Sequence, residues 1–125
     1  MSKRDVPLLL DDIIESIEKI SLYTAEMTLE SFEVDGKTLD AVVRNLEIIG
    51  EAANNIPIEF RKQITEIEWK QIIGMRHRII HEYFGVDEDI VWSVIHDDLP
   101  VLKHQIIKLL KTITPETPRE TGQAQ

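Results

Sequence analysis

Three side chains suited to chemistry lie close together in the sequence: Arg76, His81 and Tyr83, in the pattern R-x4-H-x-Y. Imidazole titrates near neutral pH and can act as a general acid or a general base. Guanidinium offers a planar fork of donors that fits phosphate oxygens. Cleavage of RNA through its own 2′-hydroxyl needs a proton acceptor, a proton donor and positive charge on the phosphorane. Arg76 and His81 could therefore support phosphodiester cleavage without a metal ion.

The sequence offers no convincing set of metal ligands. Asp97 and Asp98 are adjacent, so their side chains would diverge on a helix. His77 and His81 form an i, i+4 pair without an obvious third ligand. The chain has no cysteine, which excludes disulfides and thiolate zinc sites. We therefore expect neither a metal ion nor another cofactor.

Arg76 interrupts the apolar stripe of a predicted helix over about residues 69–84. The other positions on this stripe are Trp69, Ile72, Ile73, Ile80 and Tyr83. Because guanidinium keeps its charge in proteins, an arginine on a buried stripe needs an acidic partner, an opening or a subunit contact. One account is an internal structural salt bridge to Glu47 or Glu51, and the other is a functional site. The pattern alone leaves both open.

The spacing of Arg76 and His81 poses a geometric problem. On an ideal helix His81 lies about 140° around and about 7.5 Å along from Arg76, whereas Tyr83 lies nearly above Arg76. His81 instead lines up with His77 and Arg78. Either the helix loosens before it ends, or two protomers combine their residues across a shared cleft. A histidine near a helix C-terminus is also often stabilised there by the helix dipole alone.

An all-α helical bundle should position these residues, with four long amphipathic helices and one short one. Apolar periodicity predicts long helices over about residues 7–24, 37–55, 69–84 and 88–113, a short helical turn over 57–61 and a loop over 31–36. Gly85 can adopt the left-handed conformation that ends many helices, and Asp87 is a good N-cap for the last helix. Pro100 should kink or split that helix.

Small residues are grouped near the end of the predicted helix over 37–55. Gly50, Ala52 and Ala53 lie close together there. They would let another helix approach this one closely.

Length and composition indicate one folded domain. The chain has 125 residues, of which 42% are hydrophobic and 30% charged. We expect a helical domain over residues 1–113 and a disordered tail over 114–125, whose sequence TPETPRETGQAQ is almost without apolar residues. No stretch approaches about 20 apolar residues, and the start of the chain carries acids inside its apolar run, unlike a secretory signal. These features predict a cytoplasmic protein without membrane contact.

The net charge of −9 argues against tight, non-specific binding of RNA. The segment MRHRIIH is nevertheless locally basic. An acidic body also suits association with a basic partner, because complementary potentials speed the encounter.

The sequence around the R-x4-H-x-Y pattern resembles the HepT-like toxins of the HEPN superfamily. The segment IIGMRHRIIHEYFGVD contains the pattern, and VVRNLEIIGEAANNIP lies upstream and ends at Pro57. Members of this family combine an R-x4-6-H motif and a trailing tyrosine with a preceding helix of the LExIGEA type. The resemblance covers about residues 5–112.

This resemblance implies a HEPN-type bundle and a metal-independent endoribonuclease, the toxin of a HepT/MntA-type toxin–antitoxin system. Arg76 and His81 match the catalytic pair, and a homodimer would bring two such pairs into one cleft. Tyr83 matches the tyrosine that receives AMP from a cognate minimal nucleotidyltransferase antitoxin. The added phosphate would block the cleft and repel RNA. The candidate supporting residues are Glu51, which could orient Arg76, together with His77 and Arg78.

Two other hypotheses remain. The first is a non-catalytic helical dimer that binds nucleotide or serves as the partner and substrate of the transferase. The second is a purely structural bundle. It would require Arg76 to be fully buried against Glu47 or Glu51, with no opening nearby.

Overall fold

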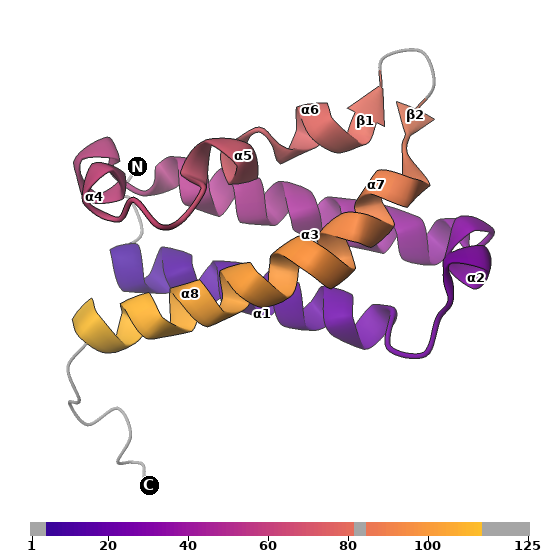
Figure 1. The fold of residues 1–125 in the computed structure, drawn as a ribbon, viewed down its shortest axis with the longest axis horizontal. Coiled ribbons are helices and arrows are strands. Elements are labelled where there is room, and N and C mark those ends of the chain that lie inside the picture. The colour runs from indigo at the N-terminus through magenta and orange to yellow at the C-terminus, as the bar shows by residue number, and fades with distance from the viewer. Residues whose placement is uncertain (1–4, 82–84, 114–125) are drawn as a thin grey trace, which may run out of the picture.

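The structure is a computed structural model that describes residues 5–81 and 85–113 as a helical bundle with a small two-stranded hairpin (Figure 1). The elements in chain order are α1 (Val6–Tyr23), α2 (Leu29–Glu33), α3 (Gly36–Asn55), α4 (Ile58–Gln63), α5 (Trp69–Ile73), α6 (Met75–Ile79), β1 (Ile80–His81), β2 (Gly85–Val86), α7 (Glu88–Ser93), the π-helical turn η1 (Val94–Asp98) and α8 (Leu99–Ile113). The predicted all-α fold is confirmed.

The core lies between α1, α3 and α8. Helix α1 packs along α3 on one side and against α8 on the other (Figure 1). Its buried apolar side chains are Leu9, Leu10, Ile13, Ile17 and Ile20. They recur at the spacing of one helical face, and burial of each stabilises the fold by about 1.5–3 kcal/mol. The predicted first and second long helices are thus confirmed to within a residue or two.

The expected loop over residues 31–36 is wrong in its first half. Residues Leu29–Glu33 form α2, whose N-terminus is closed by a capping box. The Thr28 hydroxyl accepts the Ser31 N–H at 3.1 Å, and the Ser31 hydroxyl accepts the Thr28 N–H at 3.0 Å. The side chain of Phe32 is fully buried in the core. A serine in place of the usual Glu or Gln at the third helical position hid this start signal.

The long helix predicted from Trp69 to about residue 84 is also wrong, because it is broken twice. Gly74 separates α5 from α6, and Ile80 leaves the helix for an extended conformation with φ −116° and ψ 122°. Consecutive β-branched residues at 79 and 80 favour this change. The Asp87 N–H then donates to the Ile79 carbonyl at 2.8 Å, so the end of α6 is satisfied by the returning chain.

The last helix is continuous but irregular. Its start is as predicted, since the Asp87 carboxylate accepts the Ile90 N–H at 3.1 Å. Pro100 does not split the helix. The five residues of η1 form a π-helical turn that ends two residues before Pro100, and α8 continues through the proline. A widened turn accommodates a residue that lacks an N–H and crowds the preceding turn.

Two sequence predictions fall outside the described residues: the disordered tail over 114–125 and the placement of Tyr83. Gly85 is the first residue of the second described range. It has the predicted positive φ, 76°, although it lies in β2 and does not end a helix. Within residues 5–81 and 85–113, no helix is long and apolar enough to cross a membrane.

The close approach predicted from small residues in α3 occurs at Gly50. A Cβ placed there would lie 3.2 Å from the Ile72 carbonyl oxygen and 3.5 Å from that of Ile73, both in α5. We expect Gly50→Val to lower the free energy of unfolding by about 1–3 kcal/mol, because backbone atoms must move. Denaturant unfolding measures this. Gly36→Val is the matched control in the same helix, since no atom lies within 4 Å of its Cβ position. Equal stability of the two variants would contradict the close approach.

Candidate active site around Arg76 and His81

Arg76 lies on α6 and forms an ion pair with Glu47 of α3. Its side chain is 65% exposed, whereas that of Glu47 is 25% exposed. The prediction of an arginine on a buried stripe is therefore wrong. The core-facing positions of α5 and α6 are Trp69, Ile72, Met75 and Ile79. The stripe passes through residue 75 because the break at Gly74 changes the helical phase, and Arg76 faces outward beside α3.

The Arg76 side chain lines a hollow of about 350 Å³ between α3 and the α5–α6 segment. Glu47, Glu51 and Asn54 contribute the polar side chains of this hollow, and Leu46 is among its apolar ones. Glu51 lies one helical turn beyond Glu47, yet the ion pair of Arg76 is with Glu47. The conditions for a purely structural bundle are not met, because Arg76 is exposed and lies at an opening.

His81 lies in β1, directly opposite Gly85 of β2. Its imidazole Nε2 is 3.5 Å from Oδ2 of Asp87, and its side chain is 46% exposed. The helix ends at Ile79 and so releases His81 from its predicted face, but this alone does not join His81 to Arg76. The two proposed catalytic side chains have different acidic partners, Glu47 for Arg76 and Asp87 for His81.

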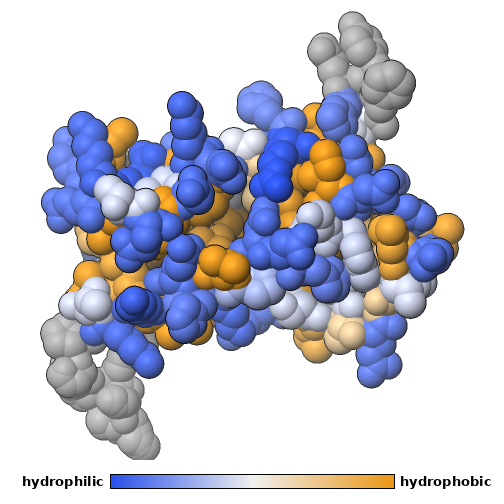
Figure 2. Space-filling view, viewed as in Figure 1, coloured by the Kyte–Doolittle hydropathy of each residue, from blue (hydrophilic) through white to orange (hydrophobic). Residues whose placement is uncertain are grey.

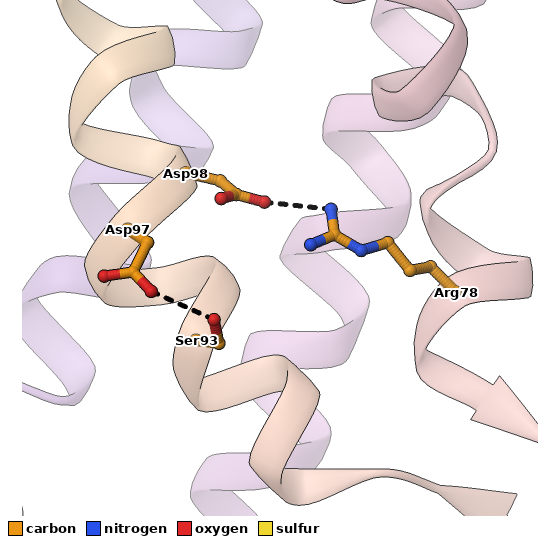
Figure 3. Close-up of polar contacts among 4 residues, drawn as sticks. All are labelled: Arg78, Ser93, Asp97 and Asp98. Carbon is orange, nitrogen blue, oxygen red and sulfur yellow. Dashed lines mark hydrogen bonds and ion pairs between the residues drawn. The ribbon is translucent and has the colours of Figure 1, made fainter.

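The two candidate supporting residues on α6 behave differently. His77 is exposed. Arg78 reaches away from the Arg76 hollow to the last helix, where its guanidinium donates to Asp98 at 2.9 Å (Figure 3). Asp97 turns the other way and accepts from the Ser93 hydroxyl at 3.0 Å, so the predicted divergence of the two aspartates is confirmed (Figure 3). Arg78 thus links α6 to η1.

The Arg78–Asp98 pair borders a second hollow, of about 300 Å³, between the α5–α6 segment and α8. Apolar side chains are visible there among hydrophilic ones (Figure 2). Its apolar lining residues are Ile72, Met75, Leu99, Val101 and Leu102. This hollow contains neither Arg76 nor His81, so the candidate catalytic side chains lie elsewhere on α6 and β1.

Carboxylates dominate the electrostatics at the α2 end of the bundle. The pKa of Glu33 is raised, first by desolvation and then by a hydrogen bond and charge repulsion with Asp89 of α7. The pKa of Asp35 is lowered, chiefly by the hydrogen bond that it accepts from the Thr38 N–H at the start of α3. The segment that carries Arg76 and Arg78, α6, contains no acidic residue.

Within residues 5–81 and 85–113, no three His, Asp or Glu side chains are grouped so that they could hold a metal ion. The expectation of no metal and no cofactor stays a prediction.

Sequence reasoning missed the direct partner of His81. The sequence predicts Asp87 only as the N-cap of the last helix, because nothing in a linear pattern shows that the chain turns back beside His81. The sequence likewise indicates no partner for Asp98 beyond a possible metal ion. Glu47 was one of two candidates for pairing with Arg76, since both it and Glu51 lie on the same face of α3.

The exposure of Arg76 leads to a prediction about stability. We expect Arg76→Ala to change the free energy of unfolding by about 1 kcal/mol or less, because exposed ion pairs contribute little. Ile79→Ala is the matched comparison on the same helix, where loss of a fully buried side chain should cost about 2–5 kcal/mol. Denaturant unfolding of both variants provides the measurement. A loss of several kcal/mol in Arg76→Ala would make the arginine a structural residue.

Comparison with known proteins agrees with these features. Residues 13–109 match the protein family described as "Ribonuclease HepT-like". A Thermococcus cleftensis protein named "Probable ribonuclease HepT" is 47% identical over 102 residues, which cover 82% of this chain and 93% of that protein. A Methanocaldococcus jannaschii protein named "Putative RNase MJ0127" is 37% identical over 116 residues, or 93% of this chain and 96% of the relative.

A second Methanocaldococcus jannaschii protein, named "Gamma-glutamylcyclotransferase and putative RNase MJ0434", is 42% identical over 111 residues. These residues are 89% of this chain, but the chain spans only about half of that relative, 50% of its length. No solved structure matches the chain significantly. Because the family match and the relatives both extend over most of the sequence, the chain belongs to the HepT-like ribonuclease family.

Proposed function

We propose that this protein is a metal-independent endoribonuclease in which Arg76 and His81 carry out the reaction. One observation carries the proposal: in a chain of the HepT-like ribonuclease family, both functional groups are accessible, 65% and 46% exposed, on the short α6–β1 segment. Arg76 and His81 are also partnered rather than buried, so neither is needed to fill the core.

The reaction would use the 2′-hydroxyl of the RNA as its own nucleophile. His81 takes the proton from this hydroxyl, and the 2′-oxygen bonds to phosphorus while the bond to the 5′-oxygen breaks. The leaving 5′-oxygen takes a proton from water or from a second imidazolium, and a 2′,3′-cyclic phosphate remains. Arg76 binds the phosphate oxygens, whose negative charge grows in the transition state.

A homodimer would complete the site. Arg76 turns toward Glu47 of α3, whereas His81 turns toward Asp87 after β2. In a shared cleft, Arg76 of one protomer and His81 of the other could contact the same RNA phosphate. The cleft would also place two locally basic segments together, which counteracts the net charge of −9 where RNA binds.

The cellular role proposed is that of a toxin controlled by a cognate minimal nucleotidyltransferase. Tyr83, two residues after His81 in the sequence, would receive AMP from this partner. The added phosphate carries negative charge and would repel an RNA backbone. The support for this role is the family membership together with the R-x4-H-x-Y pattern.

A non-catalytic partner module is the second candidate. The observation in its favour is charge: Arg76 and Arg78 are both paired with carboxylates, and the whole chain is acidic. Such a protein would form a dimer and bind the transferase without altering RNA. The two candidates differ in whether His81 changes RNA.

The cleavage test uses labelled RNA in excess EDTA. We expect the wild type to cut and to leave 2′,3′-cyclic phosphates, and His81→Ala to lose about 10²- to 10⁴-fold in rate, because the proton acceptor is removed. His104→Ala, an exposed histidine of α8, is the matched control and should cut normally. Identification of the product ends provides the second readout. If a folded wild type cuts none of a varied set of RNAs, the partner module is the better description.

The modification test uses labelled ATP and the cognate nucleotidyltransferase. We expect the wild type to acquire AMP and Tyr83→Phe to acquire none, because the acceptor hydroxyl is missing. Tyr23→Phe is the control, since Tyr23 is an exposed tyrosine on α1. Mass spectrometry of the modified peptide locates the group. Retention of the label by Tyr83→Phe would contradict the assignment of the acceptor.

A further inference from the structure

We propose that Asp87 is a positioning residue for His81, which keeps the ring proton on Nε2 and so leaves Nδ1 to exchange protons with the RNA. This inference rests on the proposed ribonuclease function and deepens it. It assigns to Asp87 a second role beside its capping of α7.

The backbone brings Asp87 to His81. In the hairpin, His81 lies opposite Gly85, and Ile80 lies opposite Val86. Asp87 is the next residue after β2, and its N–H donates to the carbonyl of Ile79 at 2.8 Å. Three consecutive backbone pairings therefore hold the segment that carries the carboxylate beside the segment that carries the imidazole.

The two carboxylate oxygens of Asp87 have separate partners. Oδ1 accepts the Ile90 N–H at 3.1 Å and caps α7, while Oδ2 lies 3.5 Å from His81 Nε2. Because the cap restrains rotation of the carboxylate, Oδ2 is held toward the ring before any substrate binds. The Asp87 side chain is 34% exposed, so water weakens this contact without removing it.

The chemistry of the contact determines which ring nitrogen reacts. An ionised carboxylate can only accept hydrogen bonds, so the nitrogen that faces it carries the proton of a neutral imidazole. Nδ1 then has the free lone pair. In the proposed reaction, Nδ1 takes the proton from the 2′-hydroxyl, the 2′-oxygen bonds to phosphorus, the bond to the 5′-oxygen breaks, and that oxygen takes a proton from water. The imidazolium that forms faces the negative charge of Asp87.

Two substitutions separate this role from capping. Asn and Ser are both good N-cap residues, so Asp87→Asn and Asp87→Ser should retain α7. With its oxygen on the Ile90 N–H, the amide of Asp87→Asn turns its NH₂ group toward Nε2. A donor there favours the opposite tautomer, with the proton on Nδ1. The shorter side chain of Asp87→Ser leaves Nε2 to water.

Asp35→Asn is the matched control. Asp35 caps α3 as Asp87 caps α7, since its Oδ1 accepts the N–H of the third residue onward, Thr38, at 3.0 Å. Its other oxygen accepts the Thr38 hydroxyl at 2.9 Å and not a histidine. A change of Asp to Asn at this cap reports any general effect of cap loss on stability and activity.

The first readout is the protonation of His81 in the full chain, from ring ¹⁵N chemical shifts. We expect the wild type and Asp35→Asn to carry the neutral proton mainly on Nε2. Asp87→Asn should shift the population toward Nδ1. This measurement does not require RNA cleavage, so it tests the positioning even if the proposed ribonuclease function fails. An unchanged tautomer in Asp87→Asn would overturn the proposal.

The second readout is cleavage of RNA. We expect Asp87→Asn to lower kcat by about 10- to 100-fold with little change in KM, less than the roughly 10⁴-fold loss for the buried aspartate of a Ser-His-Asp triad, because this contact is half exposed. Asp87→Ser should lose less, because it imposes no wrong tautomer. If Asp87 served only as a cap, Asp87→Asn would not be less active than Asp87→Ser. Equal activity of Asp87→Asn and Asp35→Asn would overturn the proposal.

Discussion

The candidate site depends on the point at which α6 ends. At Ile79 the chain leaves the helix, and the carbonyl of this residue accepts the Asp87 N–H of the returning strand. Had the helix continued, His81 would have shared a face with His77 and Arg78. The hairpin instead places His81 in an extended segment, within reach of the carboxylate that follows β2. The backbone hydrogen bond from Asp87 to Ile79 and the two residue pairs of the hairpin thus determine which groups surround the imidazole.

Helix α3 provides the other half of this arrangement. Its buried face packs on α1, while Gly50 allows the backbone of α5 to lie directly against it. That close approach brings the start of α6 over Glu47, which then pairs with Arg76. The hollow beside this pair is lined by Gly50, by the end of α5 and by the start of α6. Packing and the candidate chemistry therefore depend on the same contact.

Charge explains how an acidic protein can keep a basic site. Each arginine of α6 has one carboxylate partner, Glu47 for Arg76 and Asp98 for Arg78, and the two partners lie on different helices. These pairs are exposed or part-buried, so they orient the guanidinium groups and add little to stability. A guanidinium has five donors, so a single carboxylate leaves others available for phosphate oxygens. An arginine that is oriented by a carboxylate can thus still bind a phosphate group.

The sequence by itself determined the helical class, the bounds of α1 and α3, the cap at Asp87, and the family pattern that singles out Arg76 and His81. These features depend on local periodicity, capping and spacing, which neighbouring residues decide. Only the tertiary structure decided that the predicted helix from Trp69 breaks at Gly74 and ends at Ile79. It also decided that Arg76 is exposed, and that Glu47 and Asp87 are the acids in contact with the proposed catalytic pair. Such choices depend on long-range contacts: a backbone held against Gly50, and a strand that returns to satisfy a helix end.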